Sequence, residues 1–210
     1  MDTTSVTGRT RWRRFALVVV PAVAAAGTIL LGMANGAIAA SFSVSGSAFK
    51  VSGDELVGDG FVLYGGTAVE KGGNPANPND PKVHRVGVSG IRTVTRLSNL
   101  CQSVVVPGTP ITLVIRAGGN GTPVTATDLI IDTAQLQGNA AFNHISIGQD
   151  ASSLSAGPAG ATGAAGGFGL QANHIDIKNL RVVSWSTTAG TFNLNGLNLS
   201  INTTKSECFK

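Results

Sequence analysis

Charged residues are scarce in this chain, at 12% of its 210 residues, and the few present are unevenly placed. The formal net charge is +4, but the first 40 residues hold four arginines against one acid, Asp2. The remaining 170 residues therefore carry 11 basic and 10 acidic side chains, a net charge of +1. A domain this close to neutral lacks the basic surface that nucleic acids require, so we expect no nucleic-acid partner.

Cysteine is also scarce, with Cys101 and Cys208 the only two in the sequence. Neither has a C-x-x-C partner or a neighbouring histidine in sequence, which disfavours a reactive thiol. In an oxidising compartment two cysteines most often pair. The sequence therefore predicts a Cys101–Cys208 disulfide that ties down the C-terminus.

Long apolar runs are absent except near the N-terminus, where residues 1–40 differ from the rest of the chain. A basic head with Arg13 and Arg14 precedes an uncharged run from Phe15 to Met33, and small residues follow. This order is typical of an export signal, with cleavage expected between Ala39 and Ala40. The 19-residue run is also nearly long enough for a membrane-spanning helix. We expect residues 1–40 to form an apolar helix that acts as an export signal or as an uncleaved membrane anchor.

Helical periodicity is missing beyond residue 40, and apolar residues recur at every second position instead. Pairs such as Leu113 and Ile115, or Leu199 and Ile201, follow this pattern. A period of two indicates strands with one buried face. Residues 41–210 are therefore predicted to be one all-β extracytoplasmic domain, with Gly- and Pro-rich mobile loops near 72–82 and 155–169.

Two segments of the chain resemble each other: "FNHISIG" at 142–148 and "ANHIDIK" at 172–178. Looser copies of the same unit recur at intervals of about 15–30 residues, which favours an elongated repeat sheet or a β-solenoid; a β-sandwich is the alternative. In each segment the isoleucines should face the core, so His144, His174 and Asp176 should face solvent or a groove. These three side chains are also the candidates for a metal site, which would require their two strands to be adjacent and in register.

Motifs for catalysis and cofactor binding are absent. No Gly-x-Ser-x-Gly elbow, phosphate loop, dinucleotide fingerprint or EF-hand occurs, although a Ser-His-Asp set can assemble from distant residues. His84 follows a Pro-rich loop and should be exposed, and Trp185 should pack in a core or a loop rather than serve as a ligand platform. We expect no cofactor, and the sequence favours a protein that is not an enzyme.

Several stretches together are similar to an uncharacterised family of exported actinobacterial proteins, a domain of unknown function. They include "RWRRFA", "AASFSVSGSAFKVS", "LSNLCQSVVVP", "IGQDASSL" and "GPAGATG". The resemblance implies a cell-envelope location and a multi-spanning membrane protein as a partner. Similar proteins are sometimes labelled cholesterol esterase, but the family offers no catalytic residues to transfer.

From these features we expect an exported protein, tethered to the membrane by its N-terminal segment or secreted. Its expected role is that of a surface assembly or binding component of the cell envelope. The alternatives are a carrier of lipid or another apolar ligand and, third, an esterase.

Overall fold

The computed structural model describes residues 45–210, which form strands joined by turns and contain no α-helix. The strands are β1 (Phe49–Val69), β2 (Val83–Ser98), β3 (Leu100–Val105), β4 (Thr112–Ala117), β5 (Val124–Asn143), β6 (Ser146–Asp150), β7 (Phe168–Thr188), β8 (Thr191–Asn193) and β9 (Asn198–Asn202). A 3-10 turn, Ala151–Ser153, follows β6. The all-β prediction is confirmed.

The N-terminal predictions lie outside the described residues. They are the apolar helix, the export signal or anchor, and the cleavage point between Ala39 and Ala40. Within residues 45–210, no helix has the length and apolar character needed to cross a membrane.

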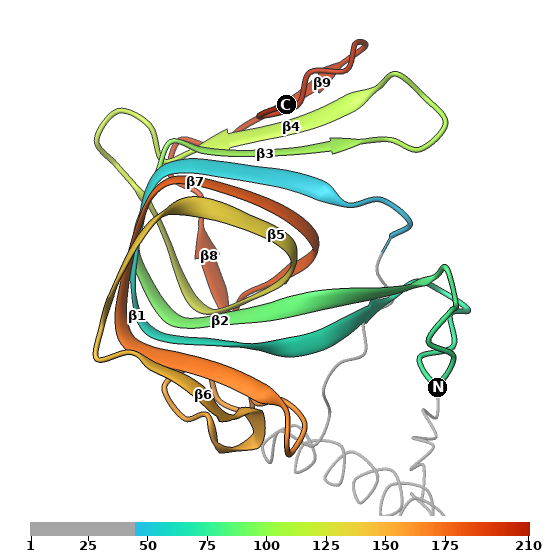
Figure 1. Ribbon diagram of the computed structural model, residues 1–210. Helices are drawn as coiled ribbons and strands as arrows, with labels where there is room; N and C mark the ends of the chain where they lie inside the picture. Colours follow the sequence, from blue (N-terminus) through green and yellow to red (C-terminus); the bar gives the residue numbers. More distant parts are fainter. Residues whose placement is uncertain (1–44) are drawn as a thin grey trace, which may run out of the picture. The chain divides into compact units, whose positions relative to one another are not determined.

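Four long strands close into a small barrel (Figure 1). β1 pairs with β2, β2 with β5, β5 with β7, and β7 returns to β1, each time antiparallel. The β1–β7 ladder runs from Phe49 opposite Ser184 to Tyr64 opposite Gly169. Closure therefore depends on residue pairs that are more than 100 positions apart in the chain.

The solenoid prediction is wrong, because a solenoid stacks sequence-adjacent repeats and this barrel pairs distant strands. The strands also belong to one continuous sheet, ordered β6-β7-β5-β2-β1-β3-β4-β9. The β-sandwich alternative, which needs two separate sheets packed face to face, does not describe it either.

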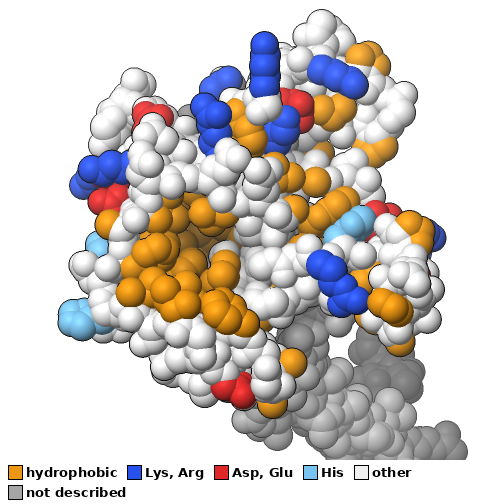
Figure 2. All heavy atoms as spheres, viewed as in Figure 1, with side chains coloured by type: hydrophobic (Ala, Val, Ile, Leu, Met, Phe, Trp, Pro, Cys, Tyr) orange, Lys and Arg blue, Asp and Glu red, His pale blue; other side chains and the backbone are white. Residues whose placement is uncertain are grey.

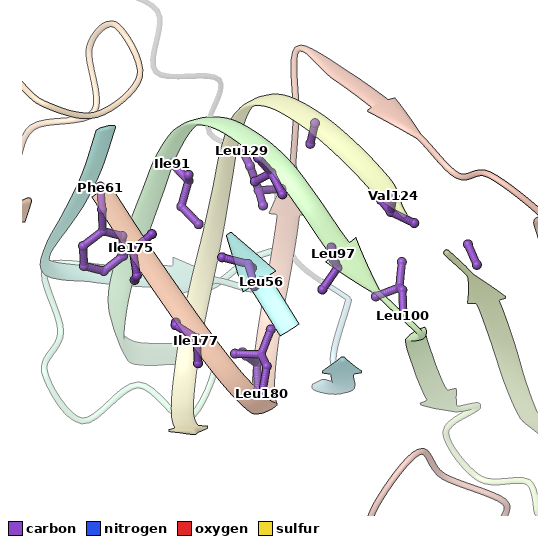
Figure 3. Packing of buried hydrophobic residues seen from close by; sticks show 14 of the residues in the cluster. Leu56, Phe61, Ile91, Leu97, Leu100, Val124, Leu129, Ile175, Ile177 and Leu180 are labelled. Atoms are coloured by element: carbon purple, nitrogen blue, oxygen red, sulfur yellow. The ribbon is translucent and has the colours of Figure 1, made fainter. Parts of the chain in front are cut away.

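The barrel encloses the main core, to which all four strands contribute alternate side chains (Figure 3). Phe61 from β1, Ile91 from β2, Leu129 from β5 and Ile175 from β7 are each at most 4% exposed. Because the sheet closes on itself, these side chains are buried without a second sheet or a layer of helices packed against it.

Two of the long strands are interrupted at a residue with left-handed backbone. Asn99, at φ 50°, separates β2 from β3, and His144, at φ 52°, lies between β5 and β6. Asparagine and histidine adopt this conformation more readily than most residues. Beyond Asn99, β3 leaves the barrel and pairs with β4, which pairs with β9 to form a three-stranded extension (Figure 1).

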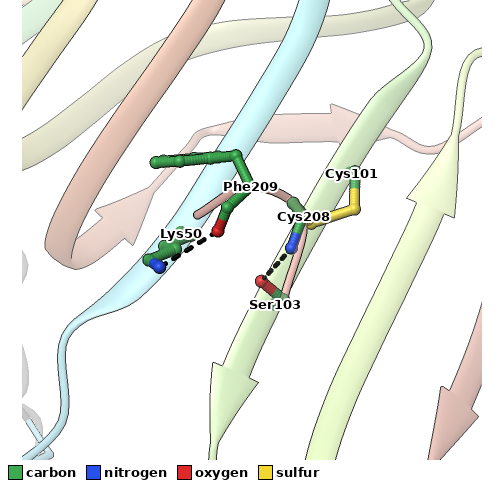
Figure 4. Close-up of a disulfide and its surroundings, with 5 residues drawn as sticks. All are labelled: Lys50, Cys101, Ser103, Cys208 and Phe209. Carbon is green, nitrogen blue, oxygen red and sulfur yellow. Dashed lines mark hydrogen bonds between the residues drawn. A yellow bond between two sulfur atoms is a disulfide. The ribbon is translucent and has the colours of Figure 1, made fainter. Parts of the chain in front are cut away.

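The C-terminal tail covers one face of this extension, where Cys101 and Cys208 form a disulfide with a Cα–Cα distance of 5.8 Å (Figure 4). The backbone N–H of Cys208 donates to Ser103 Oγ at 3.0 Å, and Lys50 Nζ donates to the carbonyl oxygen of Phe209 at 3.0 Å. The Thr112 hydroxyl donates to the carbonyl oxygen of residue 204 and accepts from the backbone N–H of residue 206. The predicted pairing of the two cysteines is confirmed.

The two loops expected to be mobile are tied down by hydrogen bonds. In the loop at 72–82, Asp80 accepts from the backbone N–H groups of residues 74 and 82. In the loop at 155–169, Arg92 donates to the carbonyl oxygens of residues 155 and 157, and Gln171 Oε1 accepts from the N–H groups of residues 155 and 156. These anchors lead us to expect that both loops are ordered.

Candidate functional site

The two histidines of the repeated segment are not gathered into one site. His174 lies on β7, where its Nδ1 is 2.7 Å from Asp59 Oδ1 on the neighbouring strand β1. His144 is exposed at the break between β5 and β6, and Asn143, not His144, stands opposite His174. Among residues 45–210 no group of three or more His, Cys, Asp or Glu side chains is placed to hold a metal ion. The register of the two strands therefore does not place His144 beside His174, as a shared metal site would require.

The repeat prediction is right for one copy and wrong for the other. Ile175 and Ile177 are buried, at 0% and 2% exposure, as predicted. Ile145 and Ile147 are exposed, at 38% and 65%. The break at His144 places Ile147 on β6, which pairs only with the first residues of β7 and ends the sheet, and the side chain stays exposed there.

Asp176, the third metal candidate, faces an open hollow of about 560 Å³ that also contains Asn139 and Lys178. Its Oδ1 atom is buried and has no hydrogen-bond partner among the described residues. The side chain as a whole is only partly buried, so water can reach the carboxylate. A single carboxylate in an open hollow provides neither a ligand set nor an acid–base pair.

His84, which the sequence predicts to be exposed, is instead part of a packed cluster. His84 Nε2 is 2.8 Å from Glu70 Oε1, and the imidazole stacks on the Trp185 ring at 3.6 Å between centroids, with an interplanar angle of 9°. Trp185 also packs against the small core of Ala68 and its neighbours outside the barrel, which confirms the packing role predicted for it. No local signal could have revealed the cluster, because residues 70, 84 and 185 meet only through the β1–β2 hairpin and the end of β7.

The two histidine–carboxylate pairs of residues 45–210 do not form part of a Ser-His-acid set. No serine hydroxyl there is hydrogen-bonded to His84 or His174, so neither histidine–carboxylate pair extends to a Ser-His-acid set. Burial raises the pKa of the Tyr64 phenol, and the nearby Asp132 carboxylate raises this pKa further. The tyrosine therefore stays protonated and is a poor nucleophile at neutral pH.

The apolar cavity inside the barrel is small. This cavity measures about 30 Å³, room for no more than a few water molecules, and is lined mainly by leucines and valines such as Leu56, Leu97 and Leu129. Small-molecule sites usually span hundreds of Å³. Figure 2 shows the apolar side chains that surround the hollowed open end of the barrel.

An apolar surface is also present on the extension. Direct cross-strand pairing places Val104 opposite Leu113, Leu113 opposite Ile201, and Ile115 opposite Leu199. Because opposed residues of an antiparallel pair share a face, these five side chains lie together on the face away from the disulfide. We call them the apolar strip: Val104, Leu113, Ile115, Leu199 and Ile201.

Exposure rises along the strip toward the edge of the sheet. Val104, Leu113 and Ile115 are half-buried, whereas Leu199 and Ile201 are 59% and 69% exposed. The alternation in this segment correctly predicted a strand, but the expected buried face is open. Contiguous exposed apolar side chains on a protein surface mark interaction sites.

The edge strand β9 lacks the features that usually prevent a further strand from pairing with it. It pairs with β4 through five consecutive residue pairs without a register shift, and it ends the sheet. Residues 182–204 contain no charged side chain and no proline, the two features that usually block an open edge. The missing charge was the signal in the sequence that could have identified this surface.

The fold and this surface together define a small all-β barrel protein with an open apolar strip. The chain belongs to the family of unknown function DUF6230, which matches residues 45–209. Neither the curated proteins nor the solved structures contain a match. The family match covers the whole barrel and its extension.

Proposed function

We propose that this protein is a non-enzymatic component of the cell envelope that binds a partner surface through the apolar strip. One observation carries the proposal: Leu199 and Ile201 are exposed on an uncharged edge strand that ends the sheet. A partner that covers the strip would remove apolar surface from water, at about 25 cal/mol per Å², and could add backbone hydrogen bonds along β9.

Export is part of the proposal. It is supported by the basic and apolar order of residues 1–40 and by the Cys101–Cys208 disulfide, since disulfides persist in oxidising compartments and are rare elsewhere. The protein would then act outside the cytoplasm, either tethered by its N-terminal segment or released. A multi-spanning membrane protein is one candidate for the partner.

Transport of a lipid or another apolar ligand is less well supported than surface binding. A cavity of about 30 Å³ has no room for an acyl chain, so a lipid would have to lie on an open apolar surface, either the apolar strip or the hollowed end of the barrel. Ester hydrolysis has still less support, because no serine is joined to the histidine–carboxylate pairs in residues 45–210.

Two matched variants test the proposal in the host cell. Leu199→Lys/Ile201→Lys places two charges on the strip, and Thr191→Lys/Asn193→Lys places two charges at the same spacing on β8. Both variants should be exported and folded, because all four side chains are exposed.

The larger complex that the natural protein forms should be visible in native gels of envelope extracts. The strip variant should lose this complex, and the β8 variant should retain it. An unchanged complex in the strip variant, or no complex with the natural protein, would contradict the proposal.

A further inference from the structure

We propose that the partner of the edge strand is a second copy of this chain, joined through antiparallel pairing of two β9 strands. The inference rests on the proposed function, since it names the partner of the same surface. It is carried by the sequence of β9 and by the way the rest of the sheet protects its other edge.

The sequence of β9 is self-complementary. Residues 198–202 read Asn-Leu-Ser-Ile-Asn, which is nearly symmetric about Ser200. A two-fold axis through Ser200 would place Leu199 of each copy opposite Ile201 of the other, and Asn198 opposite Asn202. Aliphatic residues would then meet only aliphatic residues on one face, and amides only amides on the other. A two-fold interface requires this kind of match of a surface to itself.

Electrostatics permit the pairing, because the segment that two copies would share is uncharged. Like charges placed opposite each other in a sheet are destabilising, and residues 182–204 contain none. The strips of the two copies would join into one apolar surface, with Leu199 and Ile201 at its centre and the half-buried side chains of β4 behind them.

The opposite edge of the sheet shows that this chain does protect an edge where pairing is unwanted. β6 ends the sheet on that side, and its ladder with β7 shifts register between Ile147 and Gln149. Gly148 has left-handed backbone, at φ 83°, and the strand ends in the charged Asp150. Bulges and charges of this kind discourage pairing. β9 has neither.

Cross-linking tests the register directly. In the proposed dimer Ser200 faces its own copy across the axis, at a Cα–Cα separation of about 4.5–5.5 Å that a disulfide can span. The Ser200→Cys variant of the full chain, isolated as the host processes it and treated with diamide as the oxidant, should form a disulfide-linked dimer. Asn198→Cys is the matched control, because residue 198 should face residue 202 of the other copy. It should cross-link roughly tenfold more slowly, since its two cysteines would lie several residues apart.

Peptide mapping must show that the introduced cysteines at position 200 of the two copies are linked to each other and that the Cys101–Cys208 bond is intact. Adding Ile201→Lys to Ser200→Cys should abolish the link, because two charges would enter the apolar centre. Equal cross-linking of the two single variants, or a monomeric Ser200→Cys variant, would overturn the inference. If that variant stays monomeric while the host retains a strip-dependent complex with another molecule, the proposed function stands and only the identity of the partner is wrong.

Discussion

The disulfide between Cys101 and Cys208 should supply a large share of the stability of the barrel. It closes a loop with a sequence separation of 107 residues, and it fastens the tail over one face of β3 and β4. The loss of chain entropy in the unfolded state predicts a stabilisation of about 4–5 kcal/mol for a loop of this size. For a domain of this length, that corresponds to a Tm change of roughly 10–15 °C.

The cleanest perturbation is reduction of the natural chain, because it leaves every other residue in place. Urea unfolding of the oxidised and reduced forms, followed by circular dichroism, measures the difference in the free energy of unfolding. Ser103→Ala is a useful control: it removes the acceptor for the Cys208 N–H but keeps the bond, and should cost only about 1 kcal/mol.

Hydrogen exchange gives a second readout of the same perturbation. In the reduced form, amides of β3, β4 and the tail should exchange faster than those of β1 and β7 in the closed barrel. A difference in the free energy of unfolding of about 1 kcal/mol or less between the two redox forms would refute the reasoning. It would mean that the hydrogen bonds of the tail, such as that of Lys50, hold it in place without the covalent link.

Two further predictions concern the loop at 155–169. Gly157→Ala should lower the free energy of unfolding, measured in urea, by about 1–3 kcal/mol, because the new Cβ would collide with Val62 Cγ2. Gly65→Ala is the control and should leave stability nearly unchanged, because a Cβ at this position would have no neighbouring atom within 4 Å. Equal effects of the two substitutions would contradict the packing of Gly157 on Val62. The pKa of Asp150 is lowered by hydrogen bonds from the Ser152 hydroxyl and from the backbone N–H groups of Gly166, within the loop, and Ser152. Its folded pKa therefore lies below the unfolded value of 3.8, so its contribution is present above that pH and is lost as the pH falls through the folded pKa. Amides of the loop should exchange faster, relative to those of the barrel, as the pH falls below 3.8. Asp150→Asn should abolish this pH dependence. If the pH dependence is unchanged in the variant, protonation of Asp150 is not its cause.

The all-β class and the disulfide could be predicted because each has a local or compositional signal. Period-two alternation identifies strands such as that of Ile175 and Ile177, and two cysteines in an oxidising compartment have few alternatives to pairing. Barrel closure had no such signal. It depends on β1 meeting β7, and strand periodicity says nothing about which distant strands pair.

Alternation alone does not reveal the candidate surface, because a period of two indicates a strand but not whether its apolar face is covered. The pattern of Ile145 and Ile147 is the same as that of Ile175 and Ile177, yet only the second pair faces the core. The position of a strand in the sheet decides the outcome, and a left-handed residue at His144 was enough to move the first pair past the barrel. The same applies to the apolar side chains of β9, which lies at the sheet edge and leaves them exposed.

Photo-cross-linking in living host cells tests the central claim most directly. A benzophenone amino acid placed at Leu199, on the apolar strip, should give one discrete cross-linked product, and the same probe at Asn193, on β8, should give none. Mass spectrometry of the product would identify the partner, with the chain itself expected. A probe at Leu199 that yields no product, or the same products as the probe at Asn193, would contradict the account.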